Sequence, residues 1–161
     1  MARAMILSGL ILAALPVAAQ QMVSSFESEA DLERFSIPDT IAAERVQEHA
    51  TDGEWALRLD IPGSEKDTWP GIGFAVEVDS TQYTVFAFDA FNPQDERFSL
   101  SWRLDEVGEE TEFGGASIDP NSSKRVEIWV AGRDPLARVL LYRRMPRTDA
   151  TLYIANLPWD T

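Results

Sequence analysis

Cysteine is absent from the 161-residue sequence, and basic side chains are scarce. The lack of cysteine excludes a disulfide scaffold and any metal site built on thiolates. Only 14 Lys and Arg residues stand against 27 Asp and Glu residues, so the formal net charge is −13. This charge repels nucleic-acid phosphates and anionic lipid headgroups, and no basic run offsets it. The sequence therefore predicts no nucleic-acid partner.

Histidine, the most frequent acid–base catalyst, is also scarce, since His49 is the only one. A Ser-His-Asp or Cys-His arrangement would need His49, and neither a nucleophile-elbow motif nor a cysteine accompanies it. The acidic run at 105–112 is typical of a solvated hairpin turn, whereas the paired carboxylates of a glycoside hydrolase face each other across a cleft. We therefore expect that the protein is not an enzyme.

Long hydrophobic runs are confined to the N-terminus. Arg3 precedes an apolar run at 5–14, which ends at Pro16 before the short side chains at 17–19. This pattern is typical of a secretory signal peptide. The run has about half of the ~20 residues that a membrane-spanning helix needs, so we expect no membrane insertion. The sequence predicts a signal peptide at 1–19, one domain at 20–161, and a secreted or periplasmic location.

The rest of the chain consists of short segments in which apolar and polar residues alternate, separated by turn residues. Turn signals at about ten-residue spacing are typical of sandwiches and barrels. One short helix is expected at 28–35, where Ser28 can cap the first turn. The expected fold class is all-β, an antiparallel β-sandwich with one short N-terminal helix. Strands are expected at 22–27, 41–48, 55–61, 72–78, 83–91, 98–104, 112–118, 125–130, 138–144 and 152–157.

Alternation within a strand separates inward-facing from outward-facing side chains. Trp55 and Trp102 share their faces with leucine, isoleucine or phenylalanine residues, so we expect both rings in the core. In the segment 125–130 the valine and isoleucine residues form the inner face. Trp129 is therefore expected to point outward.

Five segments, taken in order, resemble a bacterial carbohydrate-binding jelly roll, the galactose-binding-like module attached to glycoside hydrolases. The resemblance spans nearly the whole chain after residue 19. It implies a jelly-roll sandwich that binds a polysaccharide or oligosaccharide without chemistry. The segments are Phe26-Glu27, His49 to Leu59, Trp69-Pro70-Gly71, Phe88 to Pro93, and Leu152 to Leu157.

The same resemblance implies a structural calcium ion as a possible cofactor. Glu27 and Asp52 match two of the family's metal ligands, whereas Ala155 stands where the family usually has Asp. Calcium takes six to eight oxygen ligands, so the loss of one carboxylate weakens the site. Glu27 and Asp52 are the candidate metal ligands.

Aromatic and basic residues on outward faces are candidates for a carbohydrate-binding site, because an aromatic ring can stack on a pyranose while polar groups bond its hydroxyls. Trp129 is the best platform by its outward position, although it could instead pack under a loop. The stripe at 138–144 could line a concave face or cover a solvated edge. Trp69 could hold a ligand from the rim or close the end of the sandwich. The candidate residues are Trp129, Tyr142, Arg144, Arg138 and Trp69.

Two other functions stay open. The first is a structural or adhesion protein of the cell envelope that binds another protein and has lost its sugar site. Ala155 and the acidic charge favour this alternative. The second is a small jelly-roll polysaccharide lyase or hydrolase, against which the missing catalytic residues count.

Overall fold

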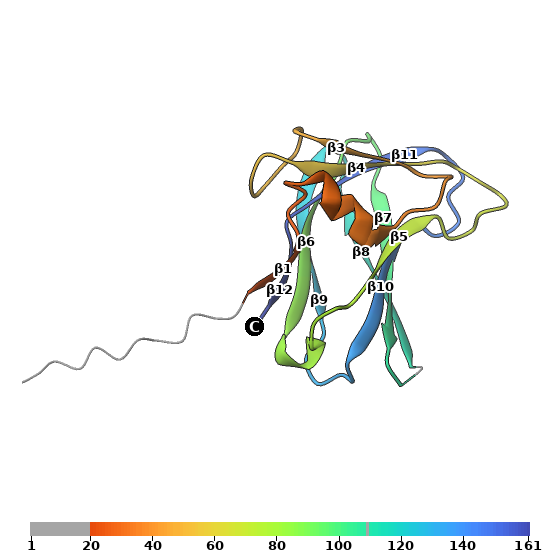
Figure 1. The fold of residues 1–161 in the computed structure, drawn as a ribbon. Coiled ribbons are helices and arrows are strands. Elements are labelled where there is room, and N and C mark those ends of the chain that lie inside the picture. The colour runs from red at the N-terminus through yellow and green to blue at the C-terminus, as the bar shows by residue number, and fades with distance from the viewer. Residues whose placement is uncertain (1–19, 109) are drawn as a thin grey trace, which may run out of the picture.

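A computed structural model of the protein describes residues 20–108 and 110–161, so the predicted signal peptide at 1–19 lies outside the described residues. The described chain forms two antiparallel sheets that face each other (Figure 1). No helix within these ranges has the length and apolar character needed to cross a membrane. The predicted all-β sandwich is confirmed.

The larger sheet is organised around β6 (Val85–Asn92), whose sequence is apolar on both faces. One edge of β6 pairs along its whole length with β9 (Ser122–Trp129). The other edge pairs first with β12 and then with β11. Beyond this edge, β12 pairs with β1, and β11 pairs with β4, which in turn pairs with β3. Their bounds are β1 Gln21–Ser24, β3 Ala42–Val46, β4 Ala56–Ile61, β11 Ala150–Ala155 and β12 Leu157–Asp160.

The smaller sheet has five strands in the order β2-β5-β10-β7-β8. The long hairpin of β7 and β8 occupies one edge (Figure 1). The two-residue strand β2 occupies the other edge and pairs with β5. Because β10 lies in the middle, its outward side chains are flanked by β5 and β7. The bounds are β2 Phe35–Ser36, β5 Gly71–Ala75, β7 Phe98–Glu106, β8 Thr111–Ile118 and β10 Leu136–Tyr142.

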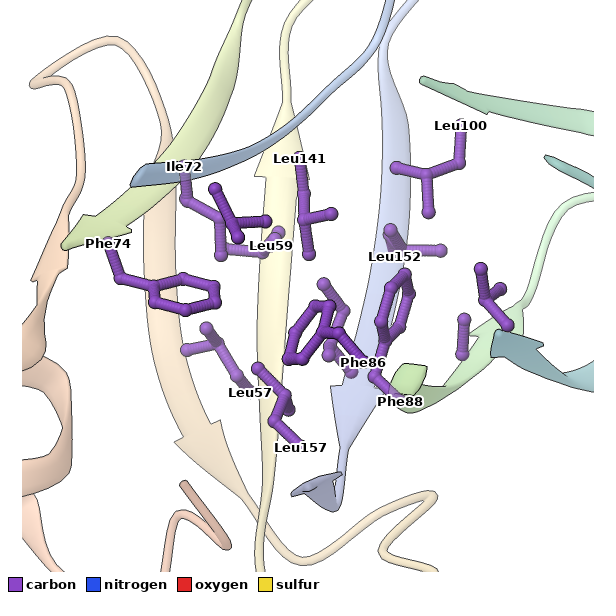
Figure 2. Close-up of a cluster of buried hydrophobic side chains, with 14 of the residues drawn as sticks. Leu57, Leu59, Ile72, Phe74, Phe86, Phe88, Leu100, Leu141, Leu152 and Leu157 are labelled. Carbon is purple, nitrogen blue, oxygen red and sulfur yellow. The ribbon is translucent and has the colours of Figure 1, made fainter. Parts of the chain in front are cut away.

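A continuous apolar core fills the space between the sheets. Alternate residues of each strand enter it, as the period of two requires. Figure 2 shows leucine and phenylalanine side chains of β4, β6, β11 and β12 meeting those of β5, β7 and β10. The core residues labelled there are Leu57, Leu59, Ile72, Phe74, Phe86, Phe88, Leu100, Leu141, Leu152 and Leu157.

Two tryptophans predicted to lie in the core are only partly buried. Trp55 and Trp102 pack against the core from its margin. The guanidinium of Arg45 lies 4.3 Å from the Trp55 ring centroid, which covers part of that ring. The fully buried tryptophan is Trp159 in β12, a strand that lies beyond the predicted final strand.

The predicted short helix is present as the 3-10 helix η1 (Glu29–Arg34), and a second 3-10 turn, η2 (Ser80–Gln82), precedes β6. The Ser28 side chain accepts the backbone N–H of Ala30 at 3.2 Å, and Asp31 accepts the N–H of Ser28 at 3.4 Å. These two bonds satisfy amide groups that the first turn of a helix leaves unpaired.

Candidate functional site

A groove of about 390 Å³ crosses the outer face of the five-stranded sheet. It runs from the loop before β5 across β5 and β10 to the β7–β8 hairpin. The residues around it are Ser36, Pro38, Trp69, Gly71, Ile72, Gly73, Arg103, Phe113, Arg138, Leu140 and Tyr142.

Two glycines of β5 leave room for this groove. In the sheet register Gly71 faces Tyr142 and Gly73 faces Leu140. A Cβ atom on Gly71 would lie 2.2 Å from the carbonyl oxygen of Leu141 and 2.5 Å from the Tyr142 Cα. A side chain at Gly71 is therefore excluded, and the sheet surface beside β10 stays hollow.

An aromatic pair forms one end of the groove. Trp69 is 52% exposed, and its ring meets the Tyr142 ring edge to face with centroids 5.3 Å apart. The Arg144 guanidinium lies 5.6 Å from the centroid of the Trp69 ring. Asp67 accepts the Trp69 backbone N–H at 3.2 Å, which helps to order the loop that carries the ring. An exposed ring supported in this way can stack on the apolar face of a sugar.

The opposite end of the groove combines another exposed ring with arginine side chains. Phe113 of β8 is 61% exposed and lies opposite Arg103 of β7. The Arg103 guanidinium is 6.0 Å from the Phe113 centroid, and its Nε donates to Asp105 at 2.5 Å. Arg138, from the exposed part of β10, lies beside this end. The groove therefore presents an aromatic ring at each end with polar donors between them.

Four of the five predicted binding residues meet at this groove. Trp69, Arg138 and Tyr142 line it, and Arg144 contacts Trp69. Trp129 does point outward, with an exposed fraction of 63%, but it belongs to β9 in the other sheet. Trp129 therefore does not line this groove.

Sequence reasoning missed Phe113 and Arg103 as groove residues. Both could have been found from alternation, because Arg103 lies on the face opposite the core residue Leu104, and Phe113 on the face opposite the buried Ile118. Alternation does not show, however, that the outward faces of these two strands adjoin that of β10. That juxtaposition depends on the pairing of β10 with β7 and of β7 with β8.

The residues matched to a calcium site fit a cation poorly. Glu27 Oε1 accepts the backbone N–H groups of Glu54 at 2.9 Å and Trp55 at 3.1 Å, so this carboxylate holds the loop after β3. Ala155 is buried and offers no side-chain oxygen. In the described part of the chain, no group of three or more His, Cys, Asp or Glu residues is placed to hold a metal. Calcium needs more oxygen ligands than Glu27 and Asp52 supply.

The only histidine packs among aromatic rings. His49 stacks on Phe91 with ring centroids 3.6 Å apart and meets Tyr153 edge to face at 4.5 Å. These contacts on the outer face of the larger sheet give His49 a packing role. Within the described residues it forms no hydrogen bond to a serine or threonine side chain, as a catalytic triad would require.

Comparisons by sequence and by structure give different results. No family model matches the sequence, and a search of curated proteins finds no significant match. By structure, the chain is similar to an exo-β-agarase, with a TM-score of 0.66 and 13% identity over 87% of this chain. It spans only 25% of that agarase chain, so the agarase activity does not transfer with the likeness.

Two carbohydrate-binding modules match over nearly their whole length. One is the family 11 module from Clostridium thermocellum in complex with a β-1,3-1,4-mixed-linked tetrasaccharide, with a TM-score of 0.65, 11% identity, and coverage of 90% of this chain and 96% of the module. The other is a xylan-binding domain of family 22, with a TM-score of 0.60, 10% identity, and coverage of 88% and 93%. The chain therefore has the jelly-roll fold of carbohydrate-binding modules, as the sequence segments indicated.

Proposed function

We propose that this chain is an exported, non-catalytic carbohydrate-binding domain whose ligand lies in the groove on the five-stranded sheet. The observation that carries the proposal is the exposed Trp69 ring, held against Tyr142 beside a hollow that the β5 glycines keep open. A sugar ring needs this combination of an apolar stacking face and an open, shallow trough.

Three further observations support the proposal. The modules that share the fold include one bound to a tetrasaccharide and one that binds xylan. The groove lining includes neither a carboxylate nor a histidine, so it lacks the acid and base of a glycosidase. The sequence at 1–19 has the pattern of a signal peptide, which favours export to a place where polysaccharides occur.

A matched pair of tryptophan variants tests the groove. Trp69 and Trp129 are both exposed, at 52% and 63%, but only Trp69 lines the groove. We expect Trp69→Ala to weaken polysaccharide binding by about 1–3 kcal/mol, the usual effect of losing an interfacial aromatic anchor. Trp129→Ala should leave binding unchanged, and both variants should keep the melting temperature of the wild type.

The measurement is affinity gel electrophoresis on a panel that includes xylan, mixed-linked β-glucan and agarose, with melting curves for each variant. A loss of binding confined to Trp129→Ala would move the site to the larger sheet and contradict the groove. If the wild-type protein binds no polysaccharide in a broad panel, the carbohydrate function itself is wrong, and a protein partner in the cell envelope becomes the better hypothesis.

A further inference from the structure

The groove differs in charge from the rest of the molecule. Acidic residues outnumber basic ones by 27 to 14 in the chain, yet the groove lining contains two arginines and no Asp or Glu. Four other hollows on the described surface each include at least one carboxylate, namely Asp60, Glu77, Glu96 and Glu65 in turn. The groove lining therefore has no carboxylate of its own on a strongly acidic protein, although Asp105 beside it offsets the charge of Arg103.

Two of the three arginines at the groove, Arg138 and Arg144, differ from those on the opposite sheet in how they are paired. On the larger sheet Arg58 bonds Asp60 at 3.0 Å, and Arg125 bonds Asp89 at 3.2 Å. At the groove, Arg103 is paired with Asp105 at 2.5 Å. Asp105 also lies opposite Arg138 in the sheet register, but Arg138 and Arg144 form no ion pair with any described residue. Since both side chains belong to exposed residues, their charges face solvent and are open to a ligand.

From this contrast we infer that the groove selects anionic polysaccharides, whose carboxylate or sulfate groups are bound by Arg138 and Arg144 while a sugar ring stacks on Trp69. The inference rests on the proposed carbohydrate function and narrows its ligand class. A guanidinium presents parallel N–H donors that match two oxygens of a carboxylate or sulfate group. The apolar walls formed by Leu140, Tyr142 and Phe113 reduce the exposure of such a contact to water, which strengthens it.

The overall charge opposes non-specific binding of an anionic polymer. An anionic polymer is repelled by most of the surface of a protein with a net charge of −13. Attraction then depends on local contacts, which the unpaired Arg138 and Arg144 can supply at the groove. Binding of an anionic polysaccharide by this protein would be a local contact and not a general ionic attraction.

Arginine variants measured on charged and neutral polymers test the inference. The panel contains polygalacturonate for carboxylate groups, carrageenan for sulfate groups, and agarose and xylan as neutral polymers. We expect the wild-type protein to bind at least one anionic polymer more tightly than either neutral polymer. Arg138→Gln and Arg144→Gln should each weaken that binding about tenfold, the change expected for one lost charge-assisted contact. The loss of binding to the anionic polymer should exceed the loss of binding to either neutral polymer.

Arg97→Gln is the matched control, because Arg97 is an exposed arginine that pairs with Asp119 at 2.9 Å and does not line the groove. It removes the same charge and should leave binding to every polymer unchanged. The polymer bound more tightly, polygalacturonate or carrageenan, identifies carboxylate or sulfate as the group recognised.

Two results would overturn the inference and leave the carbohydrate function intact. One is equal or tighter binding of a neutral polymer by the wild-type protein. The other is anionic binding that Arg138→Gln and Arg144→Gln leave unchanged, or that Arg97→Gln weakens equally. If Trp69→Ala loses all binding while the two arginine variants keep theirs, the groove is supported as the carbohydrate site and the anionic selectivity is overturned. The two proposals therefore fail by different results.

Discussion

At the scale of single residues, glycine decides how closely neighbouring side chains approach. Gly114 of β8 lies opposite Trp102 of β7 in the sheet register. A Cβ atom built on Gly114 would lie 2.4 Å from Nε1 of the Trp102 indole. The indole therefore occupies the space above Gly114, and the partial burial of Trp102 depends on the missing side chain there.

A single methyl group at Gly114 should therefore destabilise the protein. We expect Gly114→Ala to lower the free energy of unfolding by about 1–3 kcal/mol, the usual cost of overpacking, as measured by chemical denaturation. Without the clash, replacing glycine would instead stabilise by about 0.4–1 kcal/mol through the unfolded state. The control is Gly108→Ala, since the nearest atom to a Cβ at Gly108 is 3.9 Å away. Equal effects at the two positions would contradict the packing described.

At the scale of an element, a single residue separates the last two strands of the chain. Asn156 has a φ of 50° and separates β11 from β12. Its Nδ2 donates to Asp89 of β6 at 3.3 Å. The division lets β11 pair with β4 while β12 pairs with β1, and both remain beside β6 (Figure 1).

The left-handed backbone at Asn156 gives a prediction for two variants. Asn156→Ala should lower the free energy of unfolding by about 1–2 kcal/mol. Alanine is sterically strained in the left-handed conformation, and it lacks the side-chain amide that bonds Asp89. Asn156→Gly should be less harmful, since glycine adopts a positive φ without that cost. The comparison is made by thermal or chemical denaturation. If the glycine variant is no more stable than the alanine variant, the side-chain bond to Asp89 dominates and the backbone argument is wrong.

At the scale of the whole molecule, stability rests on the apolar core that joins the two sheets. The chain has no cysteine with which to form a disulfide. The carboxylate of Glu27, matched to a metal ligand in the sequence, instead accepts two backbone N–H groups of the loop that follows β3. The same loop contains Gly53, whose φ of 85° brings the backbone close to that carboxylate.

This arrangement predicts how the protein responds to calcium. Because Glu27 is used by the loop and Ala155 offers no ligand, we expect chelator or added calcium to change the melting temperature by less than about one degree. A site that is filled in the folded state must raise stability by mass action, so a clear rise with calcium would contradict this expectation and restore the metal site. Scanning calorimetry with matched magnesium controls provides the measurement.

The sequence by itself determined the class of fold and the faces of the strands. Alternation is a local property, so Leu57, Leu59 and Leu100 could be assigned to the core, and Trp129 to the surface, without knowing any strand pairing. The cap at Ser28 was likewise readable, because its bonds span only a few residues. Neither Asn156 nor Ala155 carries a local signal that ends one strand and starts another, so β12 and its buried Trp159 were missed.

Only the tertiary structure decided which outward faces lie side by side. Trp129 and Tyr142 are both aromatic residues at the ends of their strands, and both lie on outward faces. However, β9 belongs to the larger sheet and β10 to the smaller one. Sheet membership depends on pairing between segments far apart in the chain, which a period of two does not encode. That pairing brought Trp69, Tyr142 and Phe113 to one groove, and it left Trp129 on the other side of the sandwich.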